Sequence, residues 1–269
     1  MALALFCLAN APPVTACDAA TDCLLPGGRY RIRAPEGWDG RSALPAAVFF
    51  HGWQGSAAAV MADEGLSRAF SEAGVLLIAP DGLNGDWSFP GADPLAGLAK
   101  PARDELAFVH AVLADVRARL PVDQTRLWAT GFSIGGSMVW YMACDDRQEF
   151  AAFVPVGGAF WLPMRRHCGG PVNLMHIHGL TDATVPLEGR QPVPGYVQGD
   201  IFAGMARLRQ LNGCPTAPSR FERSGVLMCR IWEGCKSSHD LRLCLHPNGH
   251  ELQPAWILDS WDWVRSAAP

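Results

Sequence analysis

Short apolar runs alternate with amphipathic stretches along most of the chain. Residues 46–50 and 75–79 are apolar at every position, which is typical of strands buried on both faces. The residues between them, 56–71, have a helical pattern. This alternation predicts a single α/β domain with a mostly parallel central sheet and helices on both of its faces.

The same alternation continues to the end of the chain. An amphipathic helix is predicted before Pro121, which ends it. Its apolar positions recur at spacings of 3, 4, 3 and 4 residues: Leu106, Val109, Leu113, Val116 and Leu120. Further strands are predicted over residues 126–130, 153–156 and 172–178. Helices are predicted after Ser133 and at the C-terminus, where Ile257, Trp261 and Val264 share one face.

Two irregular stretches, residues 81–101 and 179–199, are too long to be simple connections. Loops of this size in compact domains are often functional. We find no internal repeat, low-complexity segment or linker, so we expect one domain with two long loops.

Composition excludes several classes of protein. Of the 269 residues, 49% are hydrophobic and 18% are charged, which is far from a disordered chain. The formal net charge is only -4 and no run of like charges occurs, which argues against a nucleic-acid binder. No apolar stretch reaches the roughly 20 residues of a transmembrane helix. The oligomeric state is left open.

The N-terminus resembles a secretory signal. Residues 2–9 are almost entirely apolar, and Val14-Thr15-Ala16 supplies small residues at a cleavage site. We expect residues 1–16 to be a signal peptide and residues 17–269 to be the mature domain, which would be secreted or periplasmic. A positive n-region is missing, so an ordinary apolar N-terminus is the alternative, and lipoprotein anchoring through Cys17 is a minor one.

Cysteine usage favours export. The chain has nine cysteines, and cleavage after Ala16 would discard Cys7 and leave eight, an even set suited to disulfides. A zinc site is the rival explanation, but no pair has Cys-x-x-Cys spacing. Residues 226–232 and 241–246 read as a hairpin, which would set Cys229 opposite Cys244. The expected bridges are Cys17–Cys23, Cys144–Cys168, Cys214–Cys235 and Cys229–Cys244.

The strongest local signal is Gly131-Phe132-Ser133-Ile134-Gly135-Gly136, between a predicted strand and a predicted helix. This is the context of the nucleophile elbow G-x-S-x-G, in which a tight turn exposes the serine hydroxyl. The backbone N–H of Ile134 would point at a developing oxyanion. The alternative is a glycine-rich turn in which the serine has no catalytic role.

A serine nucleophile needs a histidine base and a carboxylate that orients the histidine. In folds with this elbow, the acid follows the serine along the chain, and the histidine follows the acid. Asp182 lies after the strand at 172–178 and is the predicted acid, with Glu188 as a rival. His250 lies between a strand and the last helix and is the predicted base. His239 and His246 are its competitors.

His51-Gly52-Trp53 ends the first buried strand. The backbone N–H of Trp53, not its ring, is the predicted second oxyanion donor. His51 is a candidate to line the substrate site, although a buried histidine bonded to backbone is the preferred interpretation. Trp87 and Trp161 follow strand ends and are candidates for an apolar substrate wall, with plain packing as the alternative.

No metal or other cofactor is expected. His176 and His178 lie on the same side of a strand, but no third ligand accompanies them. His250-Glu251 is not a zinc HExxH motif because residue 254 is proline. No phosphate-binding loop or dinucleotide fingerprint occurs.

Taken together, these segments resemble the polyhydroxybutyrate depolymerase and feruloyl esterase family of α/β-hydrolases. The resemblance runs from about Pro45 to the C-terminus and rests on motifs that occur in the family's order: Phe50-His51-Gly52, Ala79-Pro80-Asp81-Gly82, Ala129-Thr130-Gly131-Phe132-Ser133, His176-Ile177-His178-Gly179 with Asp182, and Gly249-His250. It implies that Ser133, Asp182 and His250 are nucleophile, acid and base. The chain departs from its relatives at Ile134, where asparagine is frequent, and after His250, where Trp-Pro is missing.

The resulting hypothesis is a secreted serine esterase acting on a small-molecule or oligomeric ester. Feruloyl, short-chain acyl and hydroxybutyrate-type esters all remain open. A serine peptidase of the same fold and a non-catalytic binding protein are the alternatives.

Overall fold

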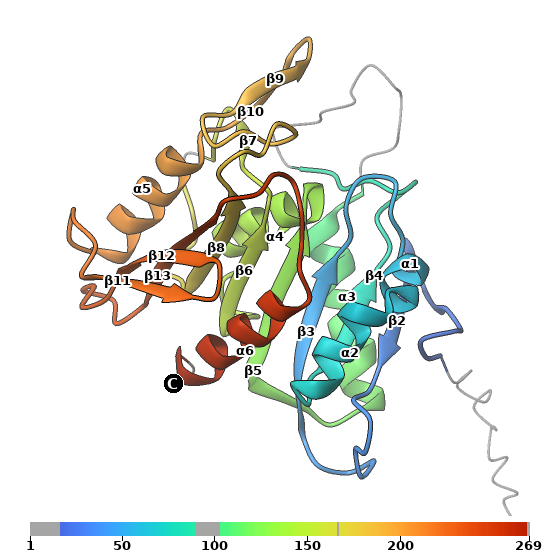
Figure 1. Ribbon diagram of the computed structural model, residues 1–269. Helices are drawn as coiled ribbons and strands as arrows, with labels where there is room; N and C mark the ends of the chain where they lie inside the picture. Colours follow the sequence, from blue (N-terminus) through green and yellow to red (C-terminus); the bar gives the residue numbers. More distant parts are fainter. Residues whose placement is uncertain (1–16, 90–102, 166, 268–269) are drawn as a thin grey trace, which may run out of the picture.

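The computed structural model describes residues 17–89, 103–165 and 167–267. The expected signal peptide lies outside the described residues, as do positions 90–101 of the first long loop. Figure 1 shows one layered α/β unit.

A ten-stranded sheet forms the centre, in the order β1-β2-β4-β3-β5-β6-β8-β13-β12-β11. The strands β4, β3, β5, β6, β8 and β13 pair in parallel, and the pairs at both edges are antiparallel. The strands are β1 Cys23–Leu25, β2 Gly28–Arg33, β3 Leu44–Phe50, β4 Leu76–Pro80, β5 Val122–Phe132, β6 Ala152–Val156, β8 Leu174–Gly179, β11 Arg220–Ser224, β12 Leu227–Trp232 and β13 Leu241–His246. The predicted mostly parallel sheet is confirmed.

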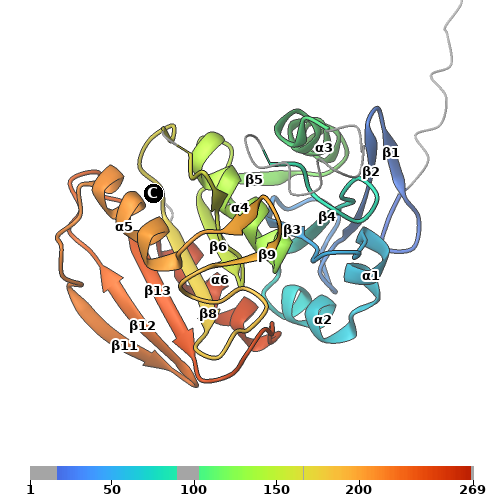
Figure 2. The ribbon, with the colours of Figure 1, turned by 90° about the horizontal axis from the view of Figure 1, so that it is seen from above.

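Helices cover both faces of the sheet, as Figure 2 shows from above. The helices are α1 Ala57–Ala62, α2 Glu64–Glu72, α3 Glu105–Arg119, α4 Ile134–Asp145, α5 Ile201–Asn212 and α6 Ala255–Ala267. One apolar layer joins the sheet to α3, α4 and α5, and the other joins it to α1, α2 and α6. Residues adjacent along β3 alternate between the two layers, which explains why that strand is apolar throughout.

Two predictions about local structure were wrong. The helix expected over residues 56–71 is two helices, because Asp63 ends α1 and caps α2 by accepting a hydrogen bond from the Leu66 N–H at 2.9 Å. The stretch 179–199, expected to be irregular, contains β9 (Arg190–Val193) and β10 (Tyr196–Gln198). β10 pairs with β9 and with β7 (Trp161–Leu162), so the three strands form a separate sheet with β10 at its centre.

Four disulfides cross-link the described chain, between the same partners that the sequence analysis expects. They are Cys17–Cys23, Cys144–Cys168, Cys214–Cys235 and Cys229–Cys244. Cys229 and Cys244 are direct register partners of β12 and β13. Among the described residues, no helix is long and apolar enough to span a bilayer.

Candidate active site

Ser133 stands at the sharp turn between β5 and α4, with φ 59° and ψ −124°. A non-glycine residue with positive φ is strained, as expected of a nucleophile elbow. The flanking glycines allow the turn to lie against β3. A β-carbon on Gly135 would lie 2.0 Å from the Phe50 carbonyl oxygen, and one on Gly131 would lie 2.7 Å from it. Small residues are therefore required on both sides of the serine.

His250 joins the serine to the carboxylate of Asp182. Its Nε2 lies 2.9 Å from Ser133 Oγ, and its Nδ1 lies 2.7 Å from Asp182 Oδ2. A carboxylate accepts a hydrogen bond from Nδ1–H, so Nε2 of the neutral ring is left to accept the serine proton. The structure thus brings together the three residues that the sequence analysis selected as nucleophile, acid and base.

Asp182 is buried, and both oxygens of its carboxylate accept hydrogen bonds. Oδ1 accepts the backbone N–H groups of Thr184 at 2.8 Å and Val185 at 2.7 Å, while Oδ2 accepts His250. Burial raises the pKa of Asp182, but the hydrogen bonds from His250 and Val185 outweigh burial and hold this pKa below its ordinary value. The carboxylate is therefore kept charged beside the imidazole.

The rival acid and bases lie elsewhere. Glu188 is exposed on the loop beyond Asp182. His239 Nδ1 lies 2.7 Å from the carbonyl of Ser237 in its own turn. His246 is buried, with its ring 4.4 Å from that of Trp256.

Two backbone N–H groups at or beside the serine turn, those of Trp53 and Ile134, have no hydrogen-bond acceptor within the part of the chain that the structure describes. The turn that carries Trp53 is held by the hydrogen bond from Gln54 N–H to the Gly85 carbonyl at 2.8 Å. A β-carbon on Gly52 would lie 3.5 Å from Ser133 Cβ, so this turn packs directly against the nucleophile. The arrangement suits an oxyanion hole.

The hydrogen bonds of the His51 ring are to backbone groups. Its side chain is buried, its Nε2 accepts the Gly82 N–H at 2.9 Å, and its Nδ1 lies 2.8 Å from the Gly52 carbonyl oxygen. Burial lowers the pKa of His51, which favours the neutral ring that these two hydrogen bonds require. These contacts and the burial favour the backbone-bonded interpretation of His51 over a substrate-lining role.

Burial of the two tryptophan candidates, Trp87 and Trp161, favours the packing alternative for both. Trp87 is 2% exposed and donates its indole N–H to the His51 carbonyl at 2.9 Å. It therefore supports the turn that carries Trp53. Trp161 is likewise buried, at the start of β7. The exposed indole at the site is that of Trp53, which is 63% exposed. Sequence reasoning missed this ring because it considered only the backbone N–H of Trp53.

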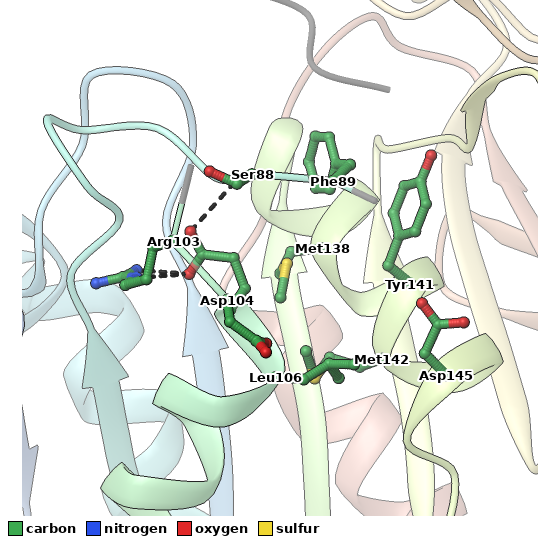
Figure 3. Close-up of a pocket in the computed structure, with 10 residues that line it drawn as sticks. Ser88, Phe89, Arg103, Asp104, Leu106, Met138, Tyr141, Met142 and Asp145 are labelled. Carbon is green, nitrogen blue, oxygen red and sulfur yellow. Dashed lines mark hydrogen bonds and ion pairs between the residues drawn. The ribbon is translucent and has the colours of Figure 1, made fainter. Parts of the chain in front are cut away.

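A hollow lies between the chain after β4 and helices α3 and α4 (Figure 3). Its wall includes Phe89, Met138 and Tyr141, and its volume is about 270 Å³. None of the three triad residues lines it. Arg103 and Glu105 form a buried ion pair at 2.6 Å in its wall.

No group of three or more histidine, cysteine or acidic side chains placed to hold a metal ion occurs among the described residues.

Comparison with known proteins agrees with this architecture. A family model described as the alpha/beta hydrolase fold matches residues 45–170. The chain is 27% identical to feruloyl esterase C of Emericella nidulans over 257 residues, which is 90% of this chain and 85% of that protein. It is 25% identical to a probable feruloyl esterase C of Aspergillus niger over 255 residues, again 90% and 85% of the two chains.

Among solved structures, an acetyl xylan esterase from Aspergillus awamori superposes with a TM-score of 0.66 at 15% identity, covering 89% of this chain and 94% of the other. At 15% identity, the superposition shows a shared fold and no more. The chain therefore has the alpha/beta hydrolase fold. Its similarity to feruloyl esterases over most of both chains indicates a carboxylic ester hydrolase.

Proposed function

We propose that this hydrolase cleaves esters through a covalent acyl-enzyme formed on Ser133. The observation that carries the proposal is the continuous hydrogen-bonded chain from Ser133 through His250 to Asp182. Ser133 Oγ attacks the ester carbonyl carbon while His250 Nε2 takes the hydroxyl proton. Asp182 holds the ring orientation and stabilises the charged imidazole.

The negative charge that develops on the carbonyl oxygen is stabilised by the N–H groups of Trp53 and Ile134. The tetrahedral intermediate then collapses, and His250 gives its proton to the departing alcohol. A water molecule repeats the sequence on the acyl-enzyme, with His250 as the base, and releases the acid and the free serine.

For the substrate we propose an ester of an aromatic or short acyl group. The exposed indole of Trp53 belongs to the turn that packs against Ser133, so a flat apolar group of the substrate would have a face to stack on. The relatives named feruloyl esterase favour the aromatic acyl group. A hydroxybutyrate-type oligomer is the remaining class to be tested.

We further propose that residues 1–16 are removed as a signal peptide and that the domain 17–269 works outside the cytoplasm. Four disulfides support an oxidising compartment. The bond between Cys17 and Cys23 speaks against lipid attachment at Cys17. N-terminal sequencing and the intact mass of protein from an exporting host test this proposal.

The catalytic proposal is tested with Ser133→Ala and with Ser42→Ala, an exposed serine outside the site, as the matched control. Ser133→Ala should lower the rate on p-nitrophenyl butyrate by about 10⁴-fold or more and abolish labelling by a fluorophosphonate. Ser42→Ala should behave as wild type. Wild-type turnover or labelling by Ser133→Ala would refute the assignment. A panel of methyl ferulate, p-nitrophenyl acetate, a hydroxybutyrate oligomer and a peptide amide then ranks the substrate classes.

A further inference from the structure

Two histidines on β8 lie directly behind the proposed catalytic acid. His176 and His178 are both 0% exposed, and their side chains share one face of the strand because they are two residues apart. His176 Nε2 lies 2.9 Å from His178 Nδ1. Neither ring belongs to the hydrogen-bonded chain that ends at Ser133.

The contacts of the pair leave only one arrangement of protons on two neutral rings. His178 Nε2 lies 2.7 Å from the carbonyl oxygen of Val185, and a carbonyl only accepts, so this nitrogen carries the proton. The Nδ1 of His178 is then an acceptor, and His176 must donate to it from Nε2–H. His176 therefore fixes the tautomer of His178.

The Val185 peptide is held at both ends. Its N–H donates to Asp182 Oδ1 at 2.7 Å, and its carbonyl accepts from His178. In addition, His178 Nε2 lies 3.5 Å from Asp182 Oδ2, the oxygen that accepts His250. The turn that carries the carboxylate is thus tied to the central sheet through one imidazole.

The electrostatic surroundings keep both rings neutral. Burial lowers the pKa of His178, and the neighbouring His250 and His246 lower it further, against the opposing effects of the Val185 carbonyl and the Asp182 carboxylate. Burial, together with the neighbouring His178, lowers the pKa of His176 well below its ordinary value, against the opposing effect of the Pro155 carbonyl. A neutral pair is what the proton arrangement requires.

We propose that His176 and His178 are positioning residues that hold Asp182 in register with His250, with His176 acting by fixing the tautomer of His178. The inference rests on the proposed serine mechanism, in which Asp182 must orient the base. It assigns a role to the pair that involves no contact with substrate and no proton transfer during turnover.

The first test needs no turnover, so it is independent of the proposed function. In wild-type protein with ¹⁵N-labelled histidine, ring-nitrogen NMR shifts report each tautomer. We expect His176 and His178 to be neutral Nε2–H tautomers that do not titrate between about pH 5 and pH 8. An Nδ1–H tautomer of His178, or titration of either ring in this range, would overturn the proposal.

The second test uses substitutions that separate positioning from simple packing. His178→Leu removes the donor, whereas His178→Gln keeps an N–H near the position of Nε2. His178→Leu should lower kcat by about 10- to 100-fold with little change in KM, because a carboxylate that is displaced orients the base poorly. His178→Gln should recover most of this loss. His176→Leu should show a smaller loss of the same kind, since His178 is then free to adopt either tautomer.

The pH profile provides the readout that packing alone would not move. When the carboxylate is loosened it stabilises the protonated base less, so the acidic limb of kcat/KM in His178→Leu should shift to lower pH. A limb unchanged from wild type, or one shifted to higher pH, would contradict the proposal. If the leucine variants do not fold, as judged by near-ultraviolet circular dichroism, the NMR measurement on wild-type protein still decides.

Discussion

The carbonyl oxygen of Gly249 occupies the space where a side chain at Gly179 would begin. A β-carbon built on Gly179 would lie 2.2 Å from this oxygen. Gly179 ends the strand that leads to Asp182, and Gly249 precedes His250, so this approach of two backbones brings the proposed acid and base together. Hydrogen bonds from Leu180 N–H to the His246 carbonyl at 2.8 Å and from Thr181 N–H to the Asn248 carbonyl at 3.2 Å close the same contact.

Gly179→Ala should therefore separate the acid and base loops. We expect kcat to fall by about 10- to 100-fold and fluorophosphonate labelling to slow in parallel, because a small misplacement of the base greatly lowers the rate. Gly204→Ala is the matched control, since a β-carbon there meets Trp140 at an ordinary 3.5 Å. Equal activity of the two variants would show that the approach is not needed.

The exposed indole of Trp53 should discriminate between acyl groups. Trp53→Ala keeps the backbone N–H but removes the ring, so kcat/KM for methyl ferulate should fall by about 10-fold, the equivalent of roughly 1.4 kcal/mol of stacking. Turnover of p-nitrophenyl acetate should change by less than about 3-fold, since its acyl group is too small to stack. Phe221→Ala, on the edge strand β11 and also exposed, serves as control. A uniform loss on both esters would point to damage of the oxyanion turn instead.

Stability should fall in mild acid. Burial is the largest cause that lowers the pKa of four histidines: His51, His176, His178 and His246. Between these lowered values and the unfolded value near pH 6.5, the unfolded chain binds more protons than the folded one. The free energy of unfolding should thus decrease on acidification by up to about 1.4 kcal/mol per pH unit for each such histidine.

Urea denaturation at several pH values between about 7.5 and 5 measures this slope. His246→Gln should reduce the slope, whereas Ser42→Ala, which removes no titrating group, should leave it as in wild type. The Asp182 carboxylate, whose pKa is lowered, stabilises the fold throughout this window. It affects the slope only at lower pH, because its stabilising effect is lost as pH falls through its folded pKa. A flat profile over the window would contradict the prediction.

All eight cysteines of the described chain should be oxidised. Thiol titration of denatured, unreduced mature protein should find no reactive thiol, and two or more would contradict the bridges. Replacing Cys144 and Cys168 together should lower the unfolding free energy by about 3 kcal/mol. Replacing Cys17 and Cys23, which close a shorter loop, should cost about 2 kcal/mol in the same model. The order of the two losses is the measurable outcome.

The parts of the fold that could be predicted are those that local chemistry determines. At Gly131, Gly135 and Gly136 of the elbow around Ser133, a β-carbon would clash with backbone, so the sequence itself indicates the tight turn. Cys229 and Cys244 could be paired because two strand-like runs joined by a turn fix their register. In both cases the signal lies within about 20 neighbouring residues.

The parts that could not be predicted depend on contacts between distant segments. Trp87 and Trp161 look like site residues because each follows a strand, yet Trp87 lies beneath the carbonyl of His51, a partner far away in sequence. The break between α1 and α2 rests on a single capping residue, Asp63, within an otherwise helical pattern. The small sheet of β7, β9 and β10 joins two chain segments whose apolar patterns are too short to read.

The order of strands across the sheet also has a consequence for how the chain acquires activity. The base follows β13, which enters the sheet beside β8, and the final helix α6 then packs against α2 from the first third of the chain. Ser133 and His250, hydrogen-bonded in the native state, are separated by 117 positions. Pairings of such long range form late and slowly. During synthesis, the segment that carries Ser133 leaves the ribosome well before the segment that carries His250. The chain should therefore have no esterase activity until β13 and α6 have packed against the rest of the fold.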